Sequence, residues 1–487
     1  MNFLKLCVII LLFSLIISYA ITEIYCLDVW LHLKTGEHIL KTKTIPHHDI
    51  FSYTVPGKHW IDHEWLSQVI FYSTYNAFGP NGLIVLRVFI IAGTFLLLFL
   101  FGYRKENYLL VSILLLAVLF LSEGRFMIRP GLFTIFFTAL FLVILTRYRS
   151  TRLLYVLPVA QLFWVNLHGY FFIGVLFMLV YSIVEIIKKK DHFSKRLITA
   201  TLLVVAASFI NPYGWKGAMY PVLTLFGYIK GDHTVFLNRI SELRPLITQN
   251  KIRLPYLIMP WLKIIIIVSG LSFLVNFRKT NISNFIIYII ALAIALKTSR
   301  NIAIFSIVAY VVTISNINDI YDTSIKFTRF RKIEKLLKIL FAITLVLFMS
   351  TLLFGNLKRE YYSFEQKKFK KFYLDTSSFS YPEKAVDFIK ENNIKGNILN
   401  DFNSGAYLIW RLFPEKKVFI DGRTEVYGPE FFKECEKIFQ DKKKLKKITS
   451  RYKINCILIT YVLNMPIPKS ILKFLYEHED WALVYLD

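Results

Sequence analysis

Long apolar runs separated by short polar connections dominate the first three quarters of the chain. Runs of about 17–25 apolar residues have the length that an α-helix needs to cross the hydrocarbon core of a membrane. We identify eleven such runs, the shorter of which are compatible with broken or tilted helices. They lie near residues 5–25, 82–102, 107–122, 131–146, 152–166, 169–187, 197–212, 256–276, 282–297, 300–316 and 336–355. The pattern predicts an all-α, multi-pass membrane domain over residues 1–355.

From residue 356 onward the pattern changes, because apolar runs shorten to the length of strands and Lys and Glu become frequent. Strand-like runs at 397–401, 418–421, 456–460 and 482–486 alternate with amphipathic helical stretches, which is typical of a small α/β domain. Ser380-Tyr381-Pro382-Glu383 indicates the start of a helix. We therefore expect a separate α/β domain over residues 356–487.

The composition agrees with a membrane protein, but the net positive charge is high for a chain with so few charged residues. Of the 487 residues, 55% are hydrophobic and only 19% are charged, whereas soluble domains contain about 25% charged residues. Even so, 59 Lys and Arg outnumber 33 Asp and Glu, which gives a net charge of +26. A basic excess of this size is also the electrostatic signature of nucleic-acid binding, so the location of the cations decides what it means.

The cations gather in alternate connections between the apolar runs. If the amino terminus is cytoplasmic, every cytoplasmic connection is basic, as the positive-inside rule requires. These residues are Arg104, Lys105, Arg147, Arg149, Arg152, Lys188, Lys189, Lys190, Lys195, Arg196, Arg278, Lys279, Lys326, Arg329, Arg331, Lys332, Lys335 and Lys338. We interpret the excess as an orientation signal for a cell-membrane protein and predict no nucleic-acid partner.

An odd number of crossings puts three segments on the exterior side, whether periplasmic or extracellular: a large first loop at 26–81, a second loop at 213–255, and the domain at 356–487. The first apolar run is also compatible with a cleavable signal ending at Ser18-Tyr19-Ala20. Either interpretation leaves the first loop outside, so any chemistry in these segments faces the exterior.

The first exterior loop is rich in acids, histidines and tryptophans. Asp28 and His32 follow the first apolar run and share one face if the stretch is helical. Further on come His47-His48-Asp49 and a segment containing Trp60, Asp62, His63, Glu64 and Trp65. Carboxylates supply bases, and aromatic rings pack against sugar faces or the membrane interface. The alternative is an aromatic belt with acids that merely face water, although an acid next to a membrane span is costly and tends to be functional.

Some outward-facing cations have no role in orientation. Arg125 and Arg129 follow the third run, and Lys297 and Arg300 lie between the ninth and tenth runs. They are candidates for binding phosphate, which guanidinium groups often hold through two hydrogen bonds. The alternative is that their side chains simply extend to the lipid headgroups. His168 lies in another outward-facing break between apolar runs. Its side chain either lines a cavity or forms a hydrogen bond between helices.

Two predicted strands of the exterior domain end in aspartate, at Asp401 and at Asp421, which Gly422-Arg423 follows. Ligands of open α/β sheets bind at the carboxyl ends of strands, so Asp421 and Arg423 are candidates for substrate binding. Turn and helix-cap roles explain the same residues equally well.

Several common sites are excluded. His63-Glu64 begins a His-Glu-x-x-His pattern, but Ser67 stands at the second histidine. The chain has no Walker loop, nucleophile elbow or dinucleotide fingerprint, and its four cysteines form no Cys-x-x-Cys pair. A Cys435–Cys456 disulfide is compatible with the predicted exterior location. No cofactor is certain; a divalent metal bound by Asp28, Asp62, Glu64 and the histidines stays open, because their spacing matches no fixed site.

The chain resembles the GT-C superfamily of polytopic membrane glycosyltransferases. The resemblance rests on the acid beside the first span, the long first loop, the many crossings and the exterior carboxy-terminal domain. It is strongest to uncharacterised prokaryotic members with Asp-x-Trp-x-His, Trp-x-Asp-His-Glu-Trp-Leu and Phe-Ile-Asp-Gly-Arg segments, here Asp28–His32, Trp60–Leu66 and Phe419–Arg423. Related groups are the protein O-mannosyltransferases, the aminoarabinose transferases and the oligosaccharyltransferase catalytic subunits.

The resemblance implies transfer of a sugar from a polyprenyl-phosphate donor to a cell-envelope acceptor, with Asp28 as base and Asp62 or Glu64 as alternative or orienting residue. It also implies the lipid bilayer as a partner, and it leaves protein partners open. Two departures are evident: Val29, and not an acid, follows Asp28, and the exterior domain lacks the Trp-Trp-Asp segment of oligosaccharyltransferases. The rival interpretations are a lipid or saccharide transporter or flippase, and a non-catalytic glycan-binding relative.

Overall fold

The computed structural model describes residues 2–188, 191–230, 234–243, 246–248, 251–252, 258–321, 331–358, 360–363, 368–371, 381–438, 440–460 and 469–486. The chain divides into two compact units. The first, here called the helical unit, contains Met1–Ile24, Phe78–Pro221 and Leu237–Asp375. The second, here called the mixed unit, contains Tyr25–Ala77, Val222–Phe236 and Thr376–Asp487. This division differs from the predicted one, because the first loop groups with the carboxy-terminal residues. Lys189, Lys190, Lys326 and Arg329 lie outside the described residues.

The helical unit consists mainly of long apolar helices. They are α1 (Asn2–Ala20), the part of α3 (Trp65–Gly102) from residue 78, α4 (Tyr108–Ser122), α5 (Gly131–Val143), α6 (Val156–Leu167), α7 (Phe172–Ile187), α8 (Asp191–Ser208), the first part of α9 (Trp215–Lys230), α11 (Ile258–Val275), α12 (Ile282–Lys297), α13 (Ile302–Tyr321) and α14 (Arg331–Leu357). Two short hairpins, β1 (Ile247–Thr248) with β2 (Lys251–Ile252) and β3 (Glu360–Ser363) with β4 (Lys368–Lys371), complete it. The short helix α10 (Thr234–Arg239) runs across the boundary between the units.

Within the described residues, eight helical segments are long and apolar enough to cross a membrane, and two shorter apolar helices cover Arg152–Leu167 and Ile282–Lys297. A helix occupies at least part of each predicted apolar run. The sequence pattern therefore located the helices correctly, while the number of membrane crossings stays a prediction.

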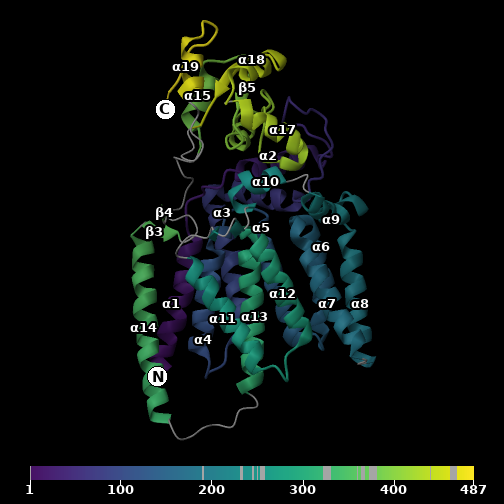
Figure 1. Ribbon diagram of the computed structural model, residues 1–487, viewed down its shortest axis with the longest axis vertical. Helices are drawn as coiled ribbons and strands as arrows, with labels where there is room; N and C mark the ends of the chain where they lie inside the picture. Colours follow the sequence, from purple (N-terminus) through teal and green to yellow (C-terminus); the bar gives the residue numbers. More distant parts are fainter. Residues whose placement is uncertain are drawn as a thin grey trace. The chain divides into compact units, whose positions relative to one another are not determined.

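Burial distinguishes inner from outer helices of this unit. On α4, the side chains from Leu114 to Phe120 are almost completely buried, and α13 is buried along most of its length. On α14, which runs beside α1 (Figure 1), Leu336, Leu340 and Leu347 are exposed although they are apolar. Apolar side chains on an outer surface are expected where the surrounding medium is lipid.

In the helical unit, some connections that the predicted topology places on the same side of the membrane contact one another. At one end, the Arg147 guanidinium donates to the Phe101 carbonyl over 2.9 Å. At the other end, Ser299 Oγ donates to the Glu242 carbonyl over 3.1 Å, and Glu242 pairs with Arg125. Which end faces the exterior stays a prediction.

Helix α3 begins earlier than the pattern indicated, at Trp65, because residues 65–77 are polar enough to lack a membrane signal but still form a helix. The helix breaks at Gly79, whose φ of 62° is in the left-handed region that glycine tolerates. Pro80 then restarts it, since proline is well accommodated in a first helical turn. The break lies beside the boundary between the two units.

The mixed unit contains a two-stranded parallel sheet surrounded by short helices. Strand β5 (Asn397–Asn400) pairs with β6 (Ile454–Leu458), with Ile398 opposite Cys456 and Asn400 opposite Leu458. The helices are α2 (Val29–Thr42), the part of α3 up to residue 77, the last part of α9, α15 (Glu383–Glu391), α16 (Gly405–Leu412), α17 (Thr424–Ile438), α18 (Lys442–Arg451) and α19 (Lys469–Glu477). Helix α2 crosses α3 closely, because Gly36 leaves room for the Gln68 carbonyl.

The predicted strands of this unit have mixed outcomes. Strands do form near 397–401 and 456–460, and a helix begins at Glu383 as predicted. Residues 418–421 form no full strand, because the first loop takes up hydrogen bonds of Val418. Val418 N donates to the Phe51 carbonyl over 3.0 Å, and the Val418 carbonyl accepts from Tyr53 N over 3.2 Å. The strand predicted at 482–486 is absent, and Val484 and Leu486 are exposed. The four cysteines are free thiols.

Candidate functional site

The three sequence segments that carry the GT-C resemblance come together in the mixed unit. Asp28 precedes the first residue of α2, and its carboxylate lies against Gly422. A methyl group added at Gly422 would be only 2.8 Å from Asp28 Oδ1. Upstream, the Tyr381 hydroxyl donates to the Cys26 carbonyl over 3.1 Å and so fixes the approach to Asp28. The acid at the start of the first loop therefore lies beside the Asp421-Gly422-Arg423 segment.

Asp421 and Arg423 form a buried ion cluster with the first-loop residue Asp49. The Arg423 guanidinium donates from Nε to Asp421 Oδ1 over 2.8 Å and from Nη2 to Oδ2 over 2.6 Å. The same Nη2 is 2.7 Å from Asp49 Oδ1. Burial alone would raise the pKa of Asp421, but Arg423 holds it below its usual value. Both residues are ionised inside the unit, and the cluster joins the first loop to the carboxy-terminal segment.

Aromatic residues enclose this cluster. The Arg423 guanidinium lies 4.7 Å from the Trp60 ring centre and 5.1 Å from that of Phe51, in cation–π range. The Tyr427 hydroxyl donates to Asp421 Oδ2 over 2.7 Å. Only 3% of Arg423 is exposed. Trp60, Asp421 and Arg423 were predicted to bind substrate; the structure places them in the interior of the mixed unit, where they contact each other.

The remaining first-loop candidates form a second cluster. Glu64 lies between two histidines: its Oε2 is 4.0 Å from His32 Nδ1, and its Oε1 is 3.6 Å from His63 Nε2. Asp62 is buried and accepts from Gln68 Nε2 over 2.8 Å. Trp65 is half-buried at the start of α3. The structure thus brings Asp62, His63, Glu64 and His32 together.

Burial and crowding change the protonation of this acid–histidine cluster. Burial, together with the Glu64 carboxylate, raises the pKa of Asp62 to about 7. For His63, burial alone would lower the pKa, but hydrogen bonding to Glu64 and the charge of Glu425 raise it to about 9. At neutral pH, His63 is a cation and Asp62 exists in both protonation states. A carboxyl with a pKa near 7 is suited to exchanging protons at neutral pH.

In the helical unit, the outward cations converge on one acid that sequence reasoning missed. Arg125 Nη1 is 2.6 Å from Glu242 Oε2, and Arg129 Nη1 is 3.2 Å from the same oxygen. Burial alone would raise the pKa of Glu242, but Arg125, Arg129 and Arg300 hold it well below its usual value. Arg300 also lies over the Tyr170 ring, 5.3 Å from its centre. Three of the four predicted outward Lys and Arg candidates therefore share one charge cluster, while Lys297 is exposed at the end of α12.

His168 is held between helices. Its Nδ1 is 2.7 Å from Thr134 Oγ1, which also accepts from Trp164 Nε1 over 3.1 Å. The imidazole stacks on Tyr170 at 5.1 Å and is buried. Of the two predicted roles, the structure favours the interhelical one. Through Tyr170, His168 lies one ring away from Arg300.

Arg87 is a second residue that sequence reasoning passed over. It lies inside the apolar run 82–102 and is almost completely buried. Its guanidinium donates to the Phe126 carbonyl over 3.3 Å and to the Thr22 carbonyl. Arg87 thus ties the chain after α1 to the turn that carries Arg125. An ionisable residue inside a membrane-spanning run is the signal that identifies it.

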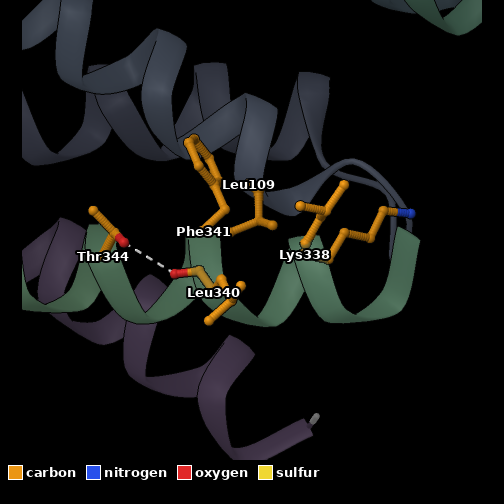
Figure 2. Close-up of a pocket in the computed structure, with 6 residues that line it drawn as sticks. Leu109, Lys338, Leu340, Phe341 and Thr344 are labelled. Carbon is orange, nitrogen blue, oxygen red and sulfur yellow. Dashed lines mark hydrogen bonds between the residues drawn. The ribbon is translucent and has the colours of Figure 1, made fainter. Parts of the chain in front are cut away.

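An apolar groove of about 520 Å³ lies between α4 and α14 (Figure 2). Of its six lining residues, Leu109, Leu337, Lys338, Leu340, Phe341 and Thr344, only Lys338 is charged. Figure 2 shows the Thr344 hydroxyl hydrogen-bonded to the Leu340 carbonyl, so this polar group is satisfied within α14. Leu109 is at the start of α4, whereas Arg125 follows its end. We assign no chemistry to the groove.

The metal alternative depends on the geometry of the donor groups. Within the described ranges, no three His, Cys, Asp or Glu side chains are positioned to hold a metal ion.

Comparison with known proteins shows which fold the chain resembles. No protein-family model matches the chain, and no curated protein is similar to it in sequence. Among solved structures, the oligosaccharyltransferase of Archaeoglobus fulgidus in its apo form is similar, with a TM-score of 0.56 and 11% identity. The match covers 93% of this chain and 69% of that one. The apolar helices and this similarity identify a membrane protein with a GT-C-like fold, as the sequence resemblance predicted.

Proposed function

We propose that the protein is a membrane glycosyltransferase that moves a sugar from a polyprenyl phosphate to a hydroxyl group of a cell-envelope acceptor. The observation that carries the proposal is the position of Asp28. On a fold shared with an oligosaccharyltransferase, this acid comes after the first apolar helix, immediately before α2, and its carboxylate lies in the cleared space beside Gly422. The predicted topology puts this reaction on the exterior face, in a bilayer that also holds the lipid donor.

In the proposed reaction, Asp28 accepts the proton of the acceptor hydroxyl as the oxygen attacks the anomeric carbon of the sugar. The bond between that carbon and the phosphate oxygen breaks, and the lipid phosphate leaves with the electron pair. Positioned general bases contribute about 10²–10⁴-fold to such steps. The chemistry also needs cations that offset the charge of the departing phosphate. Asp62 and Glu64 are the alternative bases.

The other candidates take supporting roles in this proposal. Asp421, Arg423 and Trp60 contact one another in the interior, so we assign them to holding Gly422 in place and not to binding sugar. His63 balances the charge of Glu64, and His32 Nδ1 lies 4.0 Å from the same carboxylate. Trp65, half-buried, is available for stacking on a sugar ring. Lys297 and His168 have no part in the proposed step.

The test uses the full-length chain in proteoliposomes with isotope-labelled polyprenyl-phosphate hexoses and pentoses and a cell-envelope extract as acceptor. A transferase consumes the lipid-linked sugar and releases polyprenyl phosphate together with a labelled product. A flippase moves the lipid-linked sugar between leaflets with its glycosidic bond intact, and a glycan-binding protein does neither. Intact donor across the whole panel, with protein shown to be folded, would contradict the proposal.

A further inference from the structure

Two histidines of the first loop lie directly opposite each other where the chain folds back on itself. His48 and His59 form an isolated antiparallel bridge. On one side of this bridge, the Asp49 amide donates to the Lys58 carbonyl over 2.7 Å. On the other side, the Trp60 amide donates to the carbonyl of the residue before His48 over 2.9 Å. Hydrogen bonds that flank a pair in this way define the register in which facing side chains are closest, with Cα atoms about 4.5 Å apart.

Both imidazoles project from the outer face of this short ladder. Residues directly opposite each other share a face, and their neighbours along the chain project from the other one. The neighbours Asp49 and Trp60 are buried, and both contact Arg423. His48 and His59 are exposed, and their ring centres are 5.7 Å apart with the planes inclined at 58°. The first loop therefore presents two imidazoles side by side on its exposed face.

Two imidazoles at this spacing can chelate a divalent metal ion. Neutral imidazole is the commonest metal ligand among side chains. Two nitrogens bound to one tetrahedral Zn²⁺, each at about 2.0–2.1 Å, are about 3.4 Å apart. The exposed rings reach this spacing by rotation about χ2, which has broad energy wells in histidine. Because the ladder already holds the two Cα atoms together, little ordering is needed when the ion binds.

The ligand type also selects the metal. Nitrogen ligands of this kind suit Zn²⁺, Cu²⁺ and Ni²⁺, whereas Mg²⁺ and Ca²⁺ prefer oxygen. Two protein ligands leave the remaining coordination positions to water, so this is an open site and not a closed four-ligand one. It is also smaller than the three-residue groups considered for the candidate functional site.

We propose that His48 and His59 bind one divalent metal ion of the zinc type, with water completing its coordination. The ion would join the two segments of the first loop that carry Asp49 and Trp60, on the face opposite Arg423. A ligand that binds only the folded state stabilises it, so the ion should stabilise the mixed unit. The proposal is independent of sugar transfer, because it concerns residues to which the proposed reaction gives no role.

The experiment measures Zn²⁺ binding to the full-length chain in detergent, prepared without a polyhistidine tag, by competition with a chromogenic zinc chelator. We expect a bound Zn²⁺ whose affinity falls at least tenfold in both His48→Gln and His59→Gln, because one imidazole cannot chelate. His47→Gln is the matched control: this exposed histidine is on the other face of the ladder, and its replacement should leave the affinity unchanged. A loss in only one of the pair, in neither, or equally in the control would overturn the proposal.

Thermal unfolding of the same proteins provides a second measurement. Zn²⁺ should raise the unfolding midpoint of the unaltered and His47→Gln proteins, and it should leave that of a protein with both His48→Gln and His59→Gln unchanged. An equal rise in the double variant would show that the ion binds elsewhere and that the proposal is wrong. An excess of Mg²⁺ should not displace Zn²⁺ from the unaltered protein; displacement would contradict ligation by nitrogen.

Discussion

The carboxylate of Asp28 and the backbone of Gly422 are in contact, although the two residues are separated by most of the chain. The φ of Gly422 is not in the left-handed region, so its backbone would accept any residue. What excludes a side chain is Asp28 Oδ1, which would lie 2.8 Å from a Cβ atom. Glycine is therefore required at this position because of the nearby Asp28 carboxylate and not because of the backbone conformation.

Replacing Gly422→Ala should displace the Asp28 carboxylate while leaving the fold intact. A misplacement of about 1 Å in a reacting group costs on the order of 100-fold in rate. We expect kcat for sugar transfer to fall by about that factor, with little change in the KM for donor. Gly270→Ala, where an added methyl group meets open space, is the control and should keep full activity. Equal kcat values in the two variants would show that Asp28 is not positioned by this contact.

The buried Arg423 cluster should dominate the stability of the mixed unit. Removing one partner of a buried ion pair leaves an uncompensated charge and costs about 3–5 kcal/mol. Arg423→Gln should therefore lower the free energy of unfolding by about that amount, measured by thermal unfolding of the full-length protein. Arg451→Gln, which removes an exposed arginine 3.9 Å from Glu434, should cost less than about 1 kcal/mol. Similar losses in both variants would contradict a structural role for the cluster.

The acid–histidine cluster predicts a direction for the pH dependence of stability. The folded-state pKa values of Asp62 and His63 are both raised, from 3.8 to about 7 and from 6.5 to about 9. The folded state thus binds more protons than the unfolded state across this range, and stability falls as pH rises through it. Asp62→Asn should reduce the fall in stability between about pH 4 and 7. His63→Gln should reduce the fall in stability between about pH 6.5 and 9.

Thermal unfolding midpoints across this pH range check the prediction. The control is Asp480→Asn, which removes an exposed carboxylate of the same unit and should leave the profile unchanged. A stability that rises with pH over the same interval would reverse the predicted sign.

Arg87 should be essential to the helical unit. Its replacement by Met keeps the apolar volume but leaves the carbonyl groups of Thr22 and Phe126 without their charged donor. Each buried group left unsatisfied costs about 1–3 kcal/mol. Arg87→Met should lower the unfolding temperature of the purified protein clearly, whereas Arg152→Met at an exposed position should not. A stable Arg87→Met protein would show that water or lipid replaces the guanidinium.

The sequence predicted the helices well because a membrane span needs a continuous apolar run, which is a local property. It also singled out Arg125, Arg129 and Arg300, since polar breaks between apolar runs are visible without a structure. Glu242 was missed because a lone acid in a long connection has no local pattern. The pairing of Asp421 and Arg423 with Asp49 could not be predicted, because it joins segments far apart in the chain. The strand expected at 418–421 failed for the same reason: its partner is the first loop.

The most direct test of the central claim is the single-turnover rate of sugar transfer from polyprenyl phosphate by an Asp28→Asn protein. The amide keeps the shape of the carboxylate but cannot accept the proton of the acceptor hydroxyl. We predict a loss of about 10²–10⁴-fold in the chemical step, with donor binding unchanged and with Asp480→Asn fully active. Transfer at the unaltered rate by the Asp28→Asn protein would show that Asp28 is not the base.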